Sequence, residues 1–248
     1  MGGTLYLGTS GFAYEEWRHG AFYPEGVTAS RMLAHYATVF RSVEINYTFR
    51  RFPEEATLRT WLAQTPGDFR FTLKANQRIT HTRRLRAVDG DLEDFIARAR
   101  TLGERLGPIL FQLPPNLQYD RVLIESFLPL IPPDVAGAFE FRHPSWREAD
   151  DLLAEHGLAR CVADTDEQPA SADDLPWEPF GYLRLRRVAY SADELAMWAG
   201  RIRGALGAGS DVHCYFKHED SAAGPRMALA LATLIGGSAE PAAREIRK

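Results

Sequence analysis

The sequence GYLRLRRVAYSADELAMWAGRIRGALGAGSDVHCYFK, residues 181–217, holds one complete strand–helix–strand unit. Residues 181–186 and 212–217 are short runs in which apolar residues alternate with polar ones, as in a half-buried strand. Between them, Ser191 and Glu194 have the spacing of a helical capping box, and the apolar residues that follow recur with helical periodicity. The stretch therefore predicts a β-strand, an α-helix and a second β-strand.

The same alternation extends along the whole chain. Strand-like runs lie at 5–11, 42–49, 70–74, 108–113, 137–142, 160–164, 181–186 and 212–217. Helical runs follow nearly all of them, at 29–40, from Pro53, from a predicted cap at Asp91, at 121–130, from a predicted Ser145/Glu148 capping box to 156, after Ser191, and at 225–235. About eight such units in a chain of about 250 residues are typical of a (β/α)8 TIM barrel. We predict one such α/β domain over 1–236, followed by a polar, frayed tail at 237–248; a doubly wound open sheet is the alternative.

Composition excludes several classes of protein. The chain has 248 residues, of which 45% are hydrophobic and 25% charged, as in ordinary globular proteins. No apolar run approaches the roughly 20 residues of a membrane-spanning helix, and the N-terminus lacks the pattern of a signal peptide. With two isolated cysteines and no membrane partner, we expect a cytoplasmic protein. The net charge of −4 is not that of a typical nucleic-acid-binding protein.

Polar residues gather where the predicted strands end. In a TIM barrel alternate strand residues face the lumen, and the chemistry lies at the carboxyl ends of the strands. The polar residues that we place at this mouth are Ser10, Glu44, Asn46, Lys74, Gln112, Glu140, Arg142, Asp164, Arg184, Arg186 and Lys217. A core built only for stability would not hold so many polar groups, because burying an unpaired charge costs several kcal/mol.

Cations outnumber carboxylates in this set, so it predicts a site for an anion. The loops after the seventh and eighth strands, where barrels often bind phosphate, carry Arg184, Arg186, Lys217 and His218. We expect a small anionic or phosphorylated ligand there. The alternative is that the arginines pair with Asp164, Asp166 or Glu140 in a structural network of ion pairs.

Four residues are candidates for catalysis. Glu44, Glu140 and Asp164 could act as acids or bases, and Lys74, among other cations, could have a lowered pKa and act as an acid, a base or a Schiff-base amine. A hydrolase or lyase reaction fits such a set, and the sequence does not choose between them. Retaining glycosidases need two carboxylates about 5–5.5 Å apart, and we expect Glu44 and Glu140 to lie too far across the mouth for that.

The histidines do not predict a metal centre. His81, His143 and His218 lie in predicted loops, and no two of them have the spacing of metal ligands. We therefore predict no cofactor; a divalent metal is an alternative that ligand spacing does not support. Aromatic residues of the loop after the first strand could form a lid over a ligand, but we favour packing on the barrel rim.

Several motifs resemble the family called domain of unknown function 72, or YecE-like. They are Gly8-Thr-Ser-Gly-Phe12, Val43-Glu-Ile-Asn46, Lys74 with Ile79-Thr-His81, Leu106-Gly-Pro-Ile-Leu-Phe-Gln-Leu-Pro-Pro115 and Glu140-Phe-Arg-His-Pro-Ser-Trp146. The resemblance implies a TIM barrel with no settled activity. It also implies that eight residues of this sequence belong to family motifs, namely Glu44, Asn46, Lys74, His81, Gln112, Glu140, Arg142 and His143. The chain departs from the family pattern at residues 184–187 and 216–219.

Three functions fit these observations. The first is an enzyme acting on a phosphorylated or otherwise anionic substrate, bound by Ser10, Asn46, His81, Gln112, Arg142, His143, Arg184, Arg186, Lys217 and His218. The second is a barrel that binds nucleic acid or processes phosphodiesters, by fold-level analogy to barrel endonucleases acting on abasic DNA. The third is an anion-binding barrel without catalysis.

Overall fold

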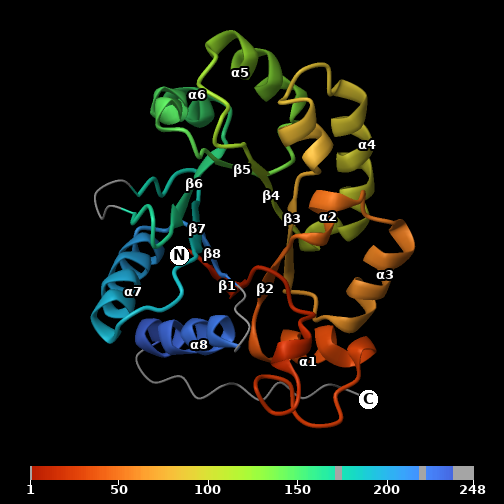
Figure 1. Cartoon of the computed structure of the whole chain (residues 1–248), viewed down its shortest axis with the longest axis vertical. Helices are drawn as coiled ribbons and strands as arrows, with labels where there is room; N and C mark the ends of the chain where they lie inside the picture. The colour runs from red at the N-terminus through yellow and green to blue at the C-terminus, as the bar shows by residue number, and fades with distance from the viewer. Residues whose placement is uncertain (1, 171–174, 218–221, 237–248) are drawn as a thin grey trace.

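The computed structural model describes residues 2–170, 175–217 and 222–236 and shows a (β/α)8 barrel, as predicted (Figure 1). Eight parallel strands form one sheet in the order β1-β8-β7-β6-β5-β4-β3-β2. The strands are β1 (Leu5–Thr9), β2 (Ser42–Ile45), β3 (Arg70–Lys74), β4 (Leu106–Gln112), β5 (Gly137–Glu140), β6 (Ala159–Asp164), β7 (Gly181–Leu185) and β8 (Val212–Phe216). The predicted tail at 237–248 lies outside the described residues.

Helices surround the sheet (Figure 1). They are α1 (Met32–Val39), α2 (Tyr47–Arg50), α3 (Glu55–Gln64), α4 (Asp89–Ala99), α5 (Arg121–Phe127), α6 (Asp150–Glu155), α7 (Ala192–Gly207) and α8 (Ala223–Gly236). Short 3-10 turns lie at Glu15–Trp17, Ala29–Arg31, Arg100–Arg105, Leu128–Leu130 and Pro144–Ala149, and a π-helical turn lies at Arg78–Thr82. In the described part of the chain, no helix is both long and apolar enough to cross a membrane.

The first and second strands close the barrel. Ser10, just after β1, forms an isolated parallel bridge with Glu44 on β2, and the Gly11 amide donates to the Glu44 carbonyl at 2.7 Å. A Cβ on Gly8 would collide with the Ser42 carbonyl, so only glycine lets the two backbones come this close. Glu44 is therefore held at the seam of the barrel.

Two apolar clusters lie on opposite sides of the sheet. The larger one fills the layer between strands and helices. The smaller one lies inside the barrel and comprises Leu110, Ala138, Ala159, Cys161, Phe180, Tyr182 and Tyr215. The Tyr215 hydroxyl, in the same lumen, is 2.7 Å from both Ser42 Oγ and Thr72 Oγ1. On the same faces of the strands, charged residues lie nearer the carboxyl ends, as the alternation of strand residues predicts.

Several strands end earlier than predicted; β1 ends at Thr9 instead of residue 11, and β7 and β8 each end one residue early. β2 ends at Ile45 instead of residue 49, because the chain turns into α2. The Thr48 hydroxyl fixes this turn by donating to the carbonyls of Ile45 and Lys74 at 3.0 and 2.7 Å. β5 ends at Glu140 instead of residue 142. In its pairing with β6, Ala138 lies opposite Ala159 and Phe139 lies opposite Arg160. The two strands separate beyond that point.

The helix caps follow the sequence in one case out of three. Ser191 and Glu194 form the predicted capping box of α7. The box predicted at Ser145 is wrong: His143 caps a 3-10 turn there, and Ser145 Oγ accepts the Tyr119 amide at 2.8 Å. The cap predicted at Asp91 is also wrong, because α4 begins at Asp89 and Asp91 binds two arginines instead.

Candidate functional site at the barrel mouth

Arg184 joins two glutamates across the mouth of the barrel. Its Nε and Nη2 donate to the two oxygens of Glu44 at 2.9 and 2.7 Å, and its Nη1 donates to Glu140. All three residues are at most 2% exposed. Burial alone would raise the pKa of both carboxyls, but the charge of Arg184 outweighs it, so that the pKa of Glu44 is lowered and that of Glu140 falls to about 2. Both glutamates are therefore ionised at neutral pH.

Two predictions about these residues need correction. Glu44 and Glu140 were expected to lie far apart across the mouth, yet both contact the same guanidinium. Arg184 was expected to bind a ligand, but it is buried and donates to protein carboxylates, as in the alternative of a structural ion pair. Because neither carboxyl holds a proton at neutral pH, this pair lacks the acid that a glycosidase needs.

Hydroxyl groups complete the surroundings of Glu44. Ser10 Oγ donates to Glu44 Oε1 at 2.7 Å, and the Tyr182 hydroxyl donates to Oε2 at 2.8 Å. The Tyr14 hydroxyl donates to the Ser10 carbonyl at 2.7 Å. Burial, and then the charge of Glu44, raise the pKa of Tyr14 to about 12, so it stays a donor. Glu44 is thus fixed by Ser10, just after β1, and by Tyr182 and Arg184 of β7.

Lys74 is linked to the same network through Gln112. Lys74 Nζ donates to Gln112 Oε1 at 2.8 Å, and Gln112 Nε2 donates to Glu140 Oε1 at 2.7 Å. Lys74 Nζ also lies 4.1 Å from the ring centroid of Phe49. Burial lowers the pKa of Lys74 to about 8, assisted by the positive charge of Arg184. At neutral pH this amine is therefore mostly protonated but loses its proton far more readily than an ordinary lysine, which suits proton transfer.

His81 lies near Lys74, and Asn46 follows the end of β2. The His81 ring packs edge-on against Phe49 with centroids 4.9 Å apart, and its Nδ1 is 2.9 Å from Thr80 Oγ1. Burial, and then the charge of Lys74, lower the pKa of His81, so its ring is neutral at pH 7. Asn46 precedes α2 without capping it through its side chain. Both residues are half-buried.

A cavity of about 620 Å³ opens where β5 and β6 separate. We call it the mouth cavity. Its charged lining consists of Arg142, Arg147, Arg160, Arg186 and Lys217 against Glu140, Asp166 and Glu167. Arg142 Nε donates to Glu140 Oε1 at 3.0 Å, which places one wall of the cavity beside the buried network. The cations in this lining outnumber the carboxylates.

Arg186 differs from its neighbour Arg184. It lies two residues further along the chain, just after the end of β7, and its half-buried side chain lines the mouth cavity. Within residues 2–170, 175–217 and 222–236, its guanidinium makes no hydrogen bond or ion pair with a side chain. Burial, and then the charge of Arg184, lower the pKa of Arg186. This cation is therefore poorly compensated by the protein around it.

The structure places some predicted site residues outside this group. Asp164 is buried beside α7, where its Oδ1 accepts from Arg187 at 2.8 and 3.0 Å, because strand alternation turns it away from the face of Ala163. His143 lines a smaller neighbouring cavity of about 330 Å³, and its Nδ1 is 2.8 Å from Ser145 Oγ. The prediction for His218 lies outside the described residues.

Four residues near the site were missed by the sequence analysis. Tyr182 bonds Glu44 and could have been found, since it shares the strand face of Arg184. Arg147 and Arg160 also line the mouth cavity. Arg147 lies in a 3-10 turn and Arg160 near the start of β6, so neither stands at the carboxyl end of a strand, where site residues were expected. Tyr14 belongs to the aromatic loop after β1. That loop packs on the rim as favoured, with Trp17 and Tyr23 fully buried.

No candidate metal centre emerges from the side chains described. Within those residues, no group of three or more histidine, cysteine, aspartate or glutamate side chains comes together in a way that could hold a metal ion. Cys161 borders the mouth cavity, but burial raises the pKa of its thiol well above its usual range.

Comparison with known proteins places the chain in a family. The family described as "Protein of unknown function DUF72" matches residues 6–247. The chain belongs to the DUF72 family. The matched region contains the network residues Glu44, Lys74, Gln112 and Glu140.

One solved structure and two curated proteins are similar to this DUF72 protein. A DUF72 family protein from Thermotoga maritima matches with a TM-score of 0.80 and 27% identity, covering 94% of this chain and 99% of that one. UPF0759 protein YecE of Escherichia coli (strain K12) is 31% identical over 158 residues, which is 60% of this chain and 57% of YecE. UPF0759 protein YunF of Bacillus subtilis (strain 168) is 28% identical over 150 residues, which is 57% of this chain and 52% of YunF. The chain thus aligns with little more than half the length of these curated relatives.

Proposed function

We propose that this DUF72 protein is an enzyme whose mouth cavity binds a small phosphorylated or otherwise anionic substrate. The observation that carries the proposal is Arg186, a half-buried guanidinium that lines the cavity without a side-chain acceptor in the described part of the protein. Its lowered pKa reflects burial and the repulsion of Arg184. A bound anion would supply the missing negative charge through charge-assisted hydrogen bonds.

The walls of the cavity support an anion in the same place. Arg142 and Lys217 line the cavity with Arg186, and Glu140 belongs both to this lining and to the buried network. Glu140 already accepts from Arg184, Gln112 and Arg142. Its charge is therefore shared among several donors, which leaves the cavity with a positive field that attracts anions.

Lys74 is the residue that we assign to proton transfer. With its pKa near 8, the amine can give or take a proton at neutral pH, and Gln112 holds it in position. Glu44 and Glu140 are positioning residues, because Arg184 keeps both of them ionised. A substrate that reaches from Arg186 across Glu140 would bring its reacting atoms toward Lys74, with Asn46 and His81 as further hydrogen-bonding groups.

The first experiment measures the melting temperature against a panel of inorganic phosphate, phosphorylated metabolites and nucleotides. Saturable binding to the folded state raises the melting temperature by mass action. We expect a selective rise that is lost in Arg186→Gln and kept in Arg59→Gln, which removes an exposed arginine on α3. Absence of any rise with every anion would overturn the proposal of an anion site.

A second experiment separates an enzyme from an anion-binding protein without catalysis. For a ligand that the panel identifies, Lys74→Met should leave the rise in melting temperature and abolish turnover. Binding without any turnover in the wild type would favour the anion-binding barrel, and turnover that does not depend on Lys74 would remove Lys74 from the mechanism.

A further inference from the structure

Six arginines form a second positive surface beside the mouth. They lie on the segments after β2 and β3 and are Arg50, Arg51, Arg78, Arg83, Arg84 and Arg86; we call them the arginine arc. The two segments pack together: Asn76 Nδ2 donates to the Thr48 carbonyl at 3.0 Å, and Phe49 contacts His81. The arc is therefore one continuous surface on the face of the barrel that carries the site.

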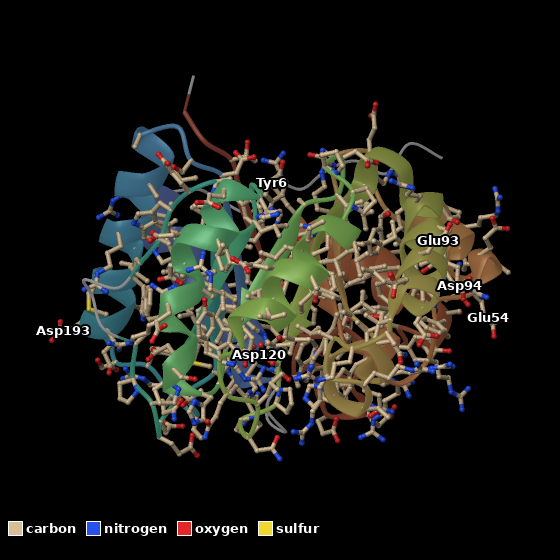
Figure 2. The ribbon with its side chains drawn as sticks, turned by 90° about the horizontal axis from the view of Figure 1, so that it is seen from above. Tyr6, Glu54, Glu93, Asp94, Asp120 and Asp193 are labelled. Atoms are coloured by element: carbon tan, nitrogen blue, oxygen red, sulfur yellow. The ribbon has the colours of Figure 1, made fainter. Side chains whose placement is uncertain are left out.

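Nearby carboxylates neutralise only part of this charge. Arg78 and Arg83 share Asp91 at 3.0 and 3.3 Å, and Arg86 pairs with Asp120 at 3.0 Å. Arg50 and Arg51 are exposed and make no ion pair with any residue that the structure describes. Figure 2 shows blue nitrogen atoms gathered along its lower edge, whereas the labelled Glu54, Glu93 and Asp94 project from the helices at one side. The arc thus places a local group of cations on a protein whose net charge is −4.

Strained backbone holds part of the arc in place. Arg84, Leu85 and Ala87 have positive φ values of 49°, 66° and 49°, which non-glycine residues rarely adopt. The Leu85 amide donates to the Ile79 carbonyl at 2.9 Å, and the Leu85 side chain is buried. Such strain persists where the surroundings impose it and is common at ligand-binding segments. Here it fixes the direction of the chain between Arg83 and Arg86.

The arc also leads to the mouth cavity and presents an exposed ring. Arg84 Nη2 donates to Asn116 Oδ1 at 3.2 Å, and the preceding residue, Pro115, lines the cavity. Tyr47, on α2 beside Arg50, is 45% exposed, which is high for a large aromatic residue. Cations spaced along a path, with an aromatic ring next to them, are the features of surfaces that bind single-stranded nucleic acids.

We infer that the arginine arc binds the phosphate backbone of a single-stranded nucleic acid and that Tyr47 stacks on one of its bases. A single small anion would contact only one or two of these separated arginines, whereas a strand offers a phosphate to each in turn. A duplex would hide the faces of its bases from Tyr47. The inference goes beyond the proposed function and does not depend on turnover in the mouth cavity.

Fluorescence anisotropy of labelled dT12 and rU12 tests this inference. We expect binding at 50 mM salt that weakens as salt rises, with a slope of about −0.7 for each phosphate contact. The triple variant Arg50→Gln/Arg51→Gln/Arg84→Gln should bind at least roughly tenfold more weakly, with a shallower slope. The matched control, Arg41→Gln/Arg59→Gln/Arg98→Gln, removes three exposed arginines outside the arc and should change the affinity less than about twofold.

Three results would overturn the inference: no binding of either oligonucleotide at 50 mM salt, equal weakening by both triple variants, or equal affinity for a sugar–phosphate chain of the same length without bases. Tyr47→Ala should weaken dT12 binding by roughly tenfold and leave binding of the base-free chain unchanged. The arc triple variant should keep the rise in melting temperature with small anions, so failure of this inference and failure of the proposed function are distinguishable.

Discussion

Arg184 and Arg186, two arginines at the barrel mouth, have opposite surroundings. Arg184 is buried and its charge is matched by Glu44 and Glu140. Arg186, two residues further along the chain, lines a cavity and has no such ion pair among the described residues. Arg184 is thus part of the core, whereas Arg186 lies in a site without a paired carboxylate.

This difference separates stability from binding. A matched buried ion pair is costly to break, because removing one partner leaves the other charge buried and alone. An unmatched cation contributes little to stability and can contribute much to the binding of an anion. Substitution of Arg184 should therefore lower the stability of the fold, whereas substitution of Arg186 should weaken anion binding. Four measurements test this difference.

The largest effect is expected for Arg184→Met. It leaves Glu44 and Glu140 buried without their cation and should lower the free energy of unfolding by about 3–5 kcal/mol. Urea denaturation measures the loss. The triple variant Glu44→Gln/Glu140→Gln/Arg184→Met should recover much of it, because no buried charge remains among the three. A loss below about 1 kcal/mol would mean that the pair is not the buried element described here.

A smaller effect should follow the titration of Lys74. Its pKa is lowered from 10.5 to about 8 in the folded protein, so between these values the unfolded chain binds more protons than the folded one. Stability must then rise with pH from about 8 to 10.5, by roughly 3 kcal/mol for this residue. The difference in free energy of unfolding between wild type and Lys74→Met shows it; a constant difference over this range would contradict the lowered pKa.

Tyr182→Phe tests a single hydrogen bond of the network around Arg184, the one from Tyr182 to Glu44. It removes one donor to Glu44 but leaves Ser10 and Arg184 in place. The expected cost is about 1 kcal/mol in the free energy of unfolding, as for one buried hydrogen bond. Differential scanning calorimetry can check it, and a cost as large as that of Arg184→Met would show that Tyr182 has a role beyond this bond.

The smallest effect on stability is expected for Arg186→Gln. Removing a half-buried, poorly compensated cation should leave the free energy of unfolding within about 0.5 kcal/mol of the wild type, or raise it. The same variant should lose the binding of anions. A loss of several kcal/mol in urea denaturation would show that Arg186 is a structural residue and would remove the contrast with Arg184.

The fold and the side of the barrel that carries the site could be predicted from the sequence. Strand alternation correctly brought Glu44, Lys74, Gln112, Glu140 and Arg184 to one mouth. It could not say which charges pair, because pairing depends on the distance across the lumen, and that distance is set by how the barrel closes at Gly8 and Ser10. Arg184 was therefore expected to bind a ligand, although it binds two glutamates.

The other differences arise from local geometry that residue types alone do not encode. Asp164 ends its strand on the opposite face from Ala163 and so pairs with Arg187. The separation of β5 from β6, which opens the mouth cavity, leaves no mark in the composition of either strand. Arg147 and Arg160 reach the cavity only because of that separation, which is why the sequence did not single them out.

Locating a bound anion in crystals of the protein would test directly whether Arg186 lies in an anion-binding site. A crystal of the wild type soaked in selenate should show an anomalous peak in the mouth cavity, with selenate oxygens about 2.8 Å from the guanidinium of Arg186. The peak should be absent in Arg186→Gln crystals treated in the same way. No peak in the cavity of the wild type, or an equal peak in the variant, would show that Arg186 does not bind an anion there.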